Sequence, residues 1–126
     1  MGQRFLIDTN IIGVLKGALP RKNALKLSKI IDEDFNISTI VNIESLGYHA
    51  ITPDDLIRSE KLLSKANVIY LDKAIERKAI EIRQQKKMKL GDSIIAATAL
   101  ANDLTIVTRN ETDFYRPKLT IYNPFD

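Results

Sequence analysis

Four acidic residues of this chain stand where a predicted strand ends or a predicted helix begins, and apolar residues flank each of them. They are Asp8, Glu44, Asp92 and Asp113. Burying a carboxylate without a partner costs several kcal/mol. Four such groups, far apart in sequence, therefore predict one shared pocket and one shared cation.

The chemistry expected of such a pocket is that of a divalent metal. Two carboxylates about 4 Å apart repel each other by about 4 kcal/mol at an effective dielectric constant of about 20, so one takes up a proton unless a cation offsets the repulsion. Hard oxygen ligands favour Mg²⁺ or Mn²⁺. One or two such ions activate a water and stabilise the charge of an in-line phosphoryl transfer. The absence of a neighbouring His or Cys argues against zinc.

Rival chemistries find little support in the sequence. The single histidine, His49, follows Gly47 and Tyr48 near a predicted helix end, where a capping or surface role is the better interpretation than a Ser-His-Asp triad. Neither Gly-x-Gly-x-x-Gly nor Gly-x-x-x-x-Gly-Lys-Ser/Thr occurs, so nucleotide cofactors are not expected.

Each acid also has an ordinary structural interpretation. Asp8 and Asp92 are of the residue type that caps helix N-termini, Glu44 could be solvated, and Asp113 could follow a turn as a cap. The coincidence of four such residues at matching positions favours the shared pocket over four separate explanations.

Strands and helices alternate along the chain that must position these acids. Strands are predicted at 4–7, 35–38, 68–71, 104–107 and, as a short fifth, 119–122. Helices are predicted at 10–16, 23–32 and 92–102. Three more are predicted from their caps: one after Ser38 or Thr39, one after Thr52 with Pro53 at its first position, and one from Asp72 to about Lys86. This alternation predicts right-handed crossovers and a mostly parallel sheet of four to five strands, covered on both faces.

Sites in open α/β sheets form beyond the carboxyl ends of the strands. Asp8 directly follows the first strand, Glu44 lies on the first turns of the helix after the second, and Asp113 lies in the loop after the fourth. Asp92 opens the helix that leads into the fourth strand and faces the same edge if that helix packs across it. The topology therefore predicts that the four acids converge.

Length and composition fit one globular domain, residues 1–126, with 44% hydrophobic and 28% charged residues. The chain has no cysteine, so disulfides and thiolate zinc sites are excluded. No apolar run approaches the roughly 20 residues of a membrane span, and neither a signal peptide nor a myristoylation motif is expected, so the cytoplasm is the expected location. The net charge of +3 and pI near 9.2 mildly favour a polyanionic partner.

Four motifs together carry a resemblance to a known family. They are Asp-Thr-Asn from Asp8, Ser-x5-Glu ending at Glu44, Asp-x2-Ile-Ala-Ala-Thr-Ala from Asp92, and Val-Thr-Arg-Asn-x2-Asp-Phe containing Asp113. In this order they resemble the PIN-domain ribonucleases, and most closely the small VapC-type toxins of type II toxin–antitoxin systems. The resemblance covers the whole chain.

The resemblance implies a three-layer α/β/α fold and an endoribonuclease that depends on Mg²⁺ or Mn²⁺. It assigns metal binding to Asp8, Glu44, Asp92 and Asp113, and a supporting role to Thr9, Asn10, Thr108 and Asn110. The fourth acid varies in place within the family; some members carry it where this chain has the neutral Asn110. It also implies a cognate antitoxin whose C-terminal segment covers the site, and a homodimer.

A basic cluster, Arg83, Lys86, Lys87 and Lys89, precedes Asp92 and could guide RNA phosphates to the metal. A solvated helix end favoured by the helix dipole is the alternative. Tyr48 and Phe114 could stack on bases, although core packing is the favoured interpretation for both.

The leading hypothesis is thus a metal-dependent endoribonuclease that acts as a toxin. One alternative is a non-catalytic PIN-like module that binds RNA or protein. Another is a phosphatase of the haloacid dehalogenase kind, whose nucleophilic Asp also follows the first strand. That chemistry requires a second Asp two residues on, where this chain has Asn10.

Overall fold

Five short strands form a wholly parallel sheet at the centre of the computed structural model, which describes residues 4–17, 21–114 and 118–125. The strands are β1 (Phe5–Ile7), β2 (Asn36–Ser38), β3 (Asn67–Ile69), β4 (Thr105–Val107) and β5 (Ile121–Tyr122). Their order across the sheet is β3-β2-β1-β4-β5. Because the chain builds outward from β1 in one direction and then in the other, the sheet reverses its strand order between β1 and β4. This is the position where open α/β sheets form their binding crevice.

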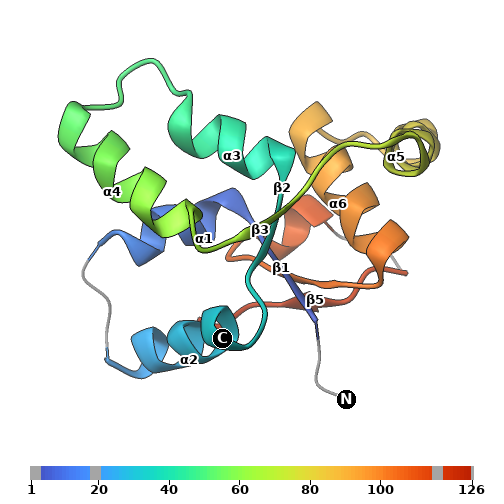
Figure 1. Cartoon of the computed structure of the whole chain (residues 1–126). Coiled ribbons are helices and arrows are strands. Elements are labelled where there is room, and N and C mark those ends of the chain that lie inside the picture. The colour runs from blue at the N-terminus through green and yellow to red at the C-terminus, as the bar shows by residue number, and fades with distance from the viewer. Residues whose placement is uncertain (1–3, 18–20, 115–117, 126) are drawn as a thin grey trace.

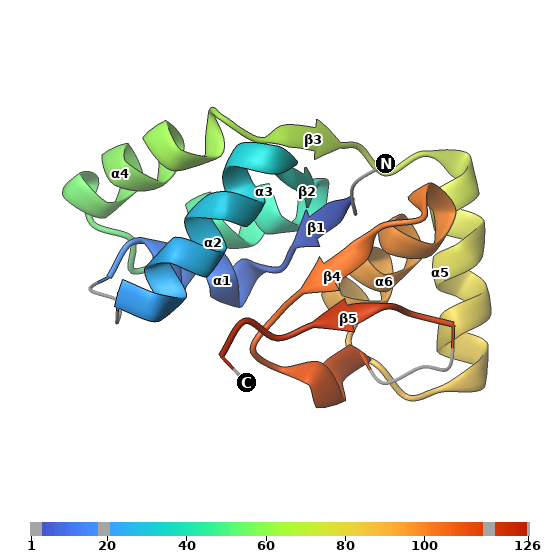
Figure 2. The same cartoon turned by 90° about the horizontal axis from the view of Figure 1, so that it is seen from below.

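Helices connect the strands and cover the sheet in three layers. The described helices are α1 (Thr9–Leu15), α2 (Arg21–Glu33), α3 (Thr39–Leu46), α4 (Pro53–Leu63), α5 (Lys73–Gln85), α6 (Leu90–Asn102) and the short 3-10 helix η1 (Glu111–Phe114). Helix α2 lies on one face of the sheet, and α3 and α6 lie on the other (Figures 1 and 2). The predicted α/β class with a parallel five-stranded sheet covered on both faces is confirmed. Within the described residues, no helix is long and apolar enough to cross a membrane.

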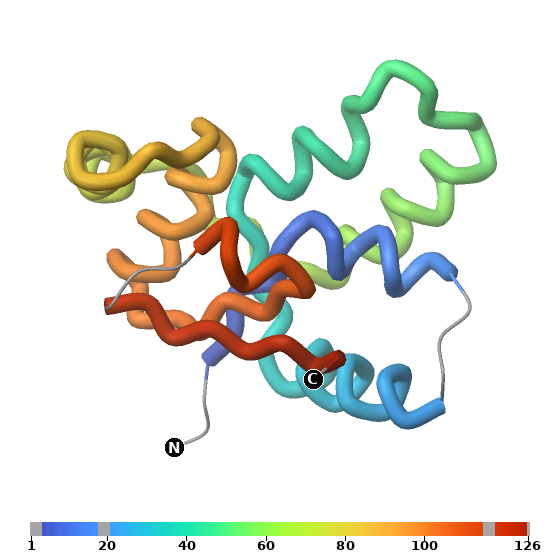
Figure 3. Tube along the Cα trace, turned by 180° about the vertical axis from the view of Figure 1, so that it is seen from behind, coloured from blue at the N-terminus to red at the C-terminus, as the bar shows by residue number. Residues whose placement is uncertain are grey.

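Helix α6 is the central helix of the layer opposite α2, between α3 and α5 (Figure 1). Its residues Ser93–Ala99 are all buried, because the sheet, α3 and α5 surround it. Alanine side chains at three of these positions let the neighbouring elements approach closely. Helix α5 packs on the outer side of α6 (Figure 3), and its buried residues are Ile75, Ala79 and Ile82.

Side-chain caps begin the helices where the sequence predicts them. Ser38 accepts a hydrogen bond from the Ile40 amide at 3.0 Å, Thr52 from the Asp55 amide at 3.1 Å, and Asp72 from the Ile75 amide at 2.9 Å. Each bond satisfies one of the free amides of a first helical turn. Of the two residues considered for the start of α3, Ser38 is therefore the cap.

Some predicted boundaries are wrong by one to three residues. Helix α6 begins at Leu90 with Lys89 in the cap position, so Asp92 lies within the first turn and the interpretation of Asp92 as a cap is wrong. The strand predicted at 68–71 is Asn67–Ile69, and Tyr70 and Leu71 are exposed beyond it. An edge strand pairs on one side, so apolar residues can continue after the ladder has ended.

Candidate functional site

Asp8 occupies the point where the sheet reverses its strand order. It directly follows β1, caps α1, and is 5% exposed. Its amide donates a hydrogen bond to the Val107 carbonyl at the end of β4, at 3.0 Å. The strand pairing of β1 and β4 therefore fixes the backbone of Asp8 at the carboxyl edge of the sheet.

Three neutral donors hold the buried carboxylate of Asp8. Oδ1 accepts from the Thr9 amide at 2.7 Å, and Oδ2 accepts from Thr108 Oγ1 at 2.8 Å and from Asn10 Nδ2 at 2.9 Å. Asn10 Nδ2 also donates to Thr108 Oγ1 at 3.1 Å, and the Asn110 amide donates to the same oxygen at 3.0 Å. Of the four predicted supporting residues, Thr9, Asn10 and Thr108 contact Asp8 directly, and Asn110 reaches it through Thr108.

Glu44 projects from α3 toward the same edge. Its Oε1 accepts a hydrogen bond from Thr9 Oγ1 at 2.7 Å, so one residue contacts Asp8 through its amide and Glu44 through its hydroxyl. Glu44 is exposed but not free in solvent. Its other oxygen lies beside Gly91, where a Cβ would come 3.4 Å from Oε2 and 3.3 Å from Ile40 Cγ2. The glycine thus lets the first turn of α6 approach α3.

Asp92 and Asp113 complete the acidic group. Asp92 is half-buried in the first turn of α6, and Asp113 is exposed on η1, where its amide donates to the Asn110 carbonyl at 3.1 Å. Both carboxylates line the same hollow of the surface. Phe114, next to Asp113, is fully buried and fixes η1 to the core, which confirms core packing for this aromatic residue.

Electrostatic interactions connect the four carboxylates in a group, with Asp92 as the member that Asp113 acts on. Burial raises the pKa of Asp8 from 3.8 to about 6, with the charges of Asp92 and Glu44 adding to the rise and the hydrogen bonds from Thr108 and Thr9 opposing it. The pKa of Asp92 is also raised, first by burial and then by the charges of Asp113 and Glu44, while Lys89 opposes the rise. Asp8, Glu44 and Asp92 therefore act on each other, and Asp113 acts on Asp92.

The donor set fits a hard divalent cation by its chemistry, since all four side chains offer carboxylate oxygens. Burial contributes most to the raised pKa values of Asp8 and Asp92, and the charges of neighbouring carboxylates add to it. Within residues 4–17, 21–114 and 118–125, however, no three acidic or histidine side chains are gathered closely enough to form a ready-made metal site. The carboxylates thus share an electrostatic environment and are spread more widely than a single coordination sphere.

The predicted basic cluster is divided between two hollows. Lys86, Lys87 and Lys89 line the hollow that also contains Asp92 and Asp113, together with Met88 and Thr112. Arg83 lines a neighbouring hollow of α5 and the loop after it, which Lys86 and Lys87 also line. The structure therefore brings three of the four cations next to the acids.

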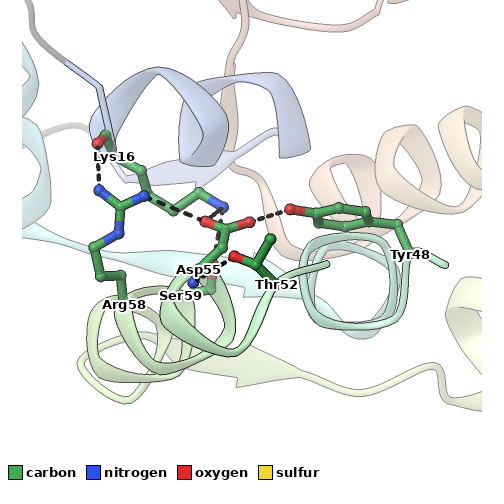
Figure 4. A network of polar contacts seen from close by, with 6 residues as sticks. All are labelled: Lys16, Tyr48, Thr52, Asp55, Arg58 and Ser59. Atoms are coloured by element: carbon green, nitrogen blue, oxygen red, sulfur yellow. Dashed lines mark hydrogen bonds and ion pairs between the residues drawn. The ribbon is translucent and has the colours of Figure 1, made fainter. Parts of the chain in front are cut away.

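A second polar network, which the sequence did not reveal, ties α1 to α4 (Figure 4). Lys16 Nζ lies 2.9 Å from Asp55 Oδ1 and donates to Ser59 Oγ at 2.8 Å. Tyr48 donates its hydroxyl to Asp55 Oδ2, and Arg58 Nη2 lies 3.8 Å from Oδ1. Tyr48 is 42% exposed, so its expected core packing is wrong. His49 is exposed after α3, consistent with a surface role.

The fold and the site together define an α/β protein with a carboxylate group at the strand-order reversal of a parallel sheet. The family model of the PIN domain matches residues 5–118, and the chain belongs to the PIN-domain family. The resemblance drawn from the four motifs is confirmed by this match.

Solved structures with the same fold include a complex described as toxin–antitoxin and several described as VapBC. The toxin–antitoxin complex from Klebsiella pneumoniae has a TM-score of 0.76 and 31% identity, over 94% of this chain and 96% of that chain. The DNA-bound VapBC from Salmonella typhimurium has a TM-score of 0.82 and 23% identity over 98% and 99%. VapBC-1 from nontypeable Haemophilus influenzae has a TM-score of 0.80 and 24% identity over 98% and 100%. No curated protein matches the sequence.

Proposed function

We propose that this chain is an endoribonuclease that depends on Mg²⁺ or Mn²⁺ and hydrolyses phosphodiester bonds of RNA. The observation that carries the proposal is the buried carboxylate of Asp8, which neutral donors hold against two further carboxylates at the reversal point of the sheet. Membership of the PIN-domain family supports the same reading.

Asp8, Glu44, Asp92 and Asp113 are the residues that would hold the metal. When bound, the metal lowers the pKa of a water molecule and offsets the charge that develops on the phosphate. The protein's own task is to keep the ligands ionised and oriented. Because the pKa of Asp8 is about 6, we expect metal affinity to rise as the pH rises through that value.

The supporting residues fix the ligands through hydrogen bonds. Thr9 orients Glu44 with its hydroxyl and Asp8 with its amide, so one residue holds both ligands. Asn10 and Thr108 hold Asp8 Oδ2, and Asn10 Oδ1 in turn accepts from the Arg109 amide at 3.1 Å. We assign Asp113 as the fourth ligand and Asn110 as its backbone support.

The biological role we propose is that of a toxin held inactive by a cognate antitoxin in the cytoplasm. The support is the likeness to the Klebsiella pneumoniae toxin–antitoxin complex, at 31% identity over nearly the whole chain. A homodimer is part of this proposal. Growth arrest on expression, relieved by Asp8→Asn, tests the toxin role, and sedimentation of the purified chain tests the dimer.

Cleavage of single-stranded RNA with and without Mg²⁺ tests the enzymatic proposal directly. Asp8→Asn keeps the size of the side chain and removes its charge, so we expect cleavage to be abolished. Asp103→Asn is the matched control, because Asp103 is exposed at the end of α6 in the left-handed conformation that Asn tolerates. Full activity of Asp8→Asn, or wild-type activity that persists in EDTA, would refute the proposal.

A non-catalytic binding module is the second candidate. It is favoured by the wide spacing of the carboxylates, which within the described residues form no ready-made metal site. Calorimetric titration with Mn²⁺ separates the two candidates. Heat of binding that disappears in Asp8→Asn supports the enzyme, and no binding at millimolar Mn²⁺ supports the module.

A further inference from the structure

The segment that follows β5 lies against the loop between β4 and η1, which carries supporting residues of the site. Asn123 Nδ2 donates a hydrogen bond to the Arg109 carbonyl at 3.4 Å. The guanidinium carbon of Arg109 lies 4.6 Å from the centre of the Phe125 ring, which is within the range of a cation–π contact. Arg109 itself is exposed. One short segment therefore holds both the backbone and the side chain of this exposed loop residue.

The same segment is fixed independently of its contact with the loop. Asn23 of α2 donates a hydrogen bond to the Pro124 carbonyl at 3.2 Å, so the segment runs beside α2 (Figure 3). The Phe125 amide donates to Asn123 Oδ1 at 2.9 Å. The Phe125 side chain is half-buried and packs against the hydrophobic core. The ring is thus a firm support for the guanidinium that lies over it.

We propose, resting on the proposed function, that Phe125 is a positioning residue of the acidic site and acts through Arg109 and Asn10. The Arg109 amide donates to Asn10 Oδ1 at 3.1 Å, and Asn10 Nδ2 donates to Asp8 Oδ2 at 2.9 Å. The ring holds Arg109, and Arg109 holds the oxygen of the Asn10 side chain. A continuous series of contacts therefore connects Phe125 with the buried carboxylate.

The orientation of the Asn10 side chain is the property that this support controls. An amide side chain has an acceptor at one end and two donors at the other, and an acceptor turned toward Asp8 would be repelled by its carboxylate. The Arg109 amide binds Oδ1, which leaves Nδ2 to donate to Asp8 and to Thr108 Oγ1. Because Arg109 lies in an exposed loop, its position depends on the few contacts that hold it, among them the ring of Phe125.

Hydrogen exchange of the Arg109 amide in the metal-free chain tests the inference without metal or substrate. Phe125→Leu keeps an apolar side chain against the core and removes the ring. We expect exchange to become about threefold faster, the factor that corresponds to an exposed cation–π contact. Phe125→Tyr keeps the ring and should restore wild-type exchange. Unchanged exchange in Phe125→Leu overturns the inference.

Tyr70→Leu is the matched control for the loss of a ring. Tyr70 is 68% exposed and follows β3, which lies at the opposite edge of the sheet from β5. This variant should keep both the exchange of the Arg109 amide and the affinity for metal. An equal effect of Tyr70→Leu and Phe125→Leu on that amide would contradict the assigned contact.

Calorimetric titration with Mn²⁺ tests whether the contact reaches the acidic site. We expect the dissociation constant to rise about threefold in Phe125→Leu and to return to the wild-type value in Phe125→Tyr. Arg109→Gln should have the same effect, although it removes a positive charge from the chain and by charge alone would favour a cation. Tighter binding of Mn²⁺ by Arg109→Gln overturns the inference, because the residue would then act by its charge and not by its position.

A double variant with Asn10→Ala tests the route from the ring to the carboxylate. Thr9 and Thr108 still donate to Asp8 in this background, so we expect measurable binding of Mn²⁺. Phe125→Leu should not weaken that binding further, since the residue through which it acts is gone. A threefold effect that persists without Asn10 overturns the inference. If the wild-type chain binds no Mn²⁺ at millimolar concentration, the proposed function fails, and the exchange measurement decides separately whether Phe125 holds the loop.

Discussion

Asp8→Asn provides a test of the site that does not depend on finding the natural substrate. The carboxyl of Asp8 has a pKa of about 6 in the folded chain, against 3.8 for an ordinary Asp. Below both values the folded and unfolded chains each carry the proton. Between them the unfolded chain is ionised while the folded chain keeps its proton, so the free energy of unfolding falls as the pH rises. Above about pH 6 both chains are ionised, and the free energy of unfolding falls no further.

The size of this loss follows from the pKa difference. At about 1.4 kcal/mol per pH unit, the rise from 3.8 to about 6 corresponds to about 3 kcal/mol. Asp8 is 5% exposed, so solvent screening reduces this value little. The free energy of unfolding of a typical domain is about 5–15 kcal/mol, so ionisation of the buried carboxylate removes a large share of it. An asparagine at this position loses hydrogen bonds but does not titrate.

Chemical denaturation of both proteins between about pH 3 and about pH 7 measures the effect in EDTA. We expect the stability of Asp8→Asn relative to wild type to rise by about 3 kcal/mol over this interval. In wild type alone, Mg²⁺ at about 100 times its dissociation constant should restore about 2.7 kcal/mol. The control Asp103→Asn should follow the wild-type curve. Parallel curves for wild type and Asp8→Asn would refute the buried, mutually repelling carboxylates on which the proposed site rests.

Two further predictions concern the contact of α6 with α3 and the ion pair of Lys16 with Asp55. Gly91→Ala places a Cβ 3.3 Å from Ile40 Cγ2, a tight contact that α3 must yield to, and 3.4 Å from Glu44 Oε2. Because this shift displaces Glu44, we expect RNA cleavage to fall severalfold, while Tm changes little because Ala is the better helix former by about 1 kcal/mol. Gly13→Ala, with nothing within 4 Å of the new Cβ, should raise Tm and leave cleavage unchanged, so equal losses in both variants would contradict the role of Gly91. Lys16→Met should lower Tm at neutral pH, because it removes the cation beside Asp55. The hydrogen bonds from Tyr48 and Lys16 lower the pKa of Asp55, so thermal denaturation should show the difference shrinking as the pH falls below 3.8.

The sequence was most informative where a local rule decides the structure. Apolar runs and caps such as Ser38, Thr52 and Asp72 located the elements, because each cap bonds an amide two or three residues ahead. The position of Asp8 after β1 placed it at the carboxyl edge, since parallel strands end at a common edge. These features depend on a few neighbouring residues, which a sequence shows directly.

Contacts between distant residues were beyond such rules. Lys16 and Asp55 are 39 residues apart, and nothing in their local sequence indicates that they pair. The importance of Gly91 depends on the distance between α6 and α3, which is a property of packing. The start of α6 was missed because Lys89 caps it without a side-chain hydrogen bond, and Asp92 offered a better cap by type.

A comparison of Asp8 with Asp55 shows why the site is better explained by a cation than by stability. Both acids lie in or beside the first turn of a helix. Asp55 is compensated within the chain: Lys16 lies at 2.9 Å and Arg58 at 3.8 Å, and the hydrogen bonds from Tyr48 and then Lys16 lower its pKa. Asp8 accepts hydrogen bonds from neutral donors and lies near further carboxylates. It forms no ion pair with a described residue, and its pKa is raised. The same fold therefore neutralises one carboxylate with lysine and leaves the other with uncompensated negative charge. We infer that this charge is kept for a cation that the chain itself does not supply.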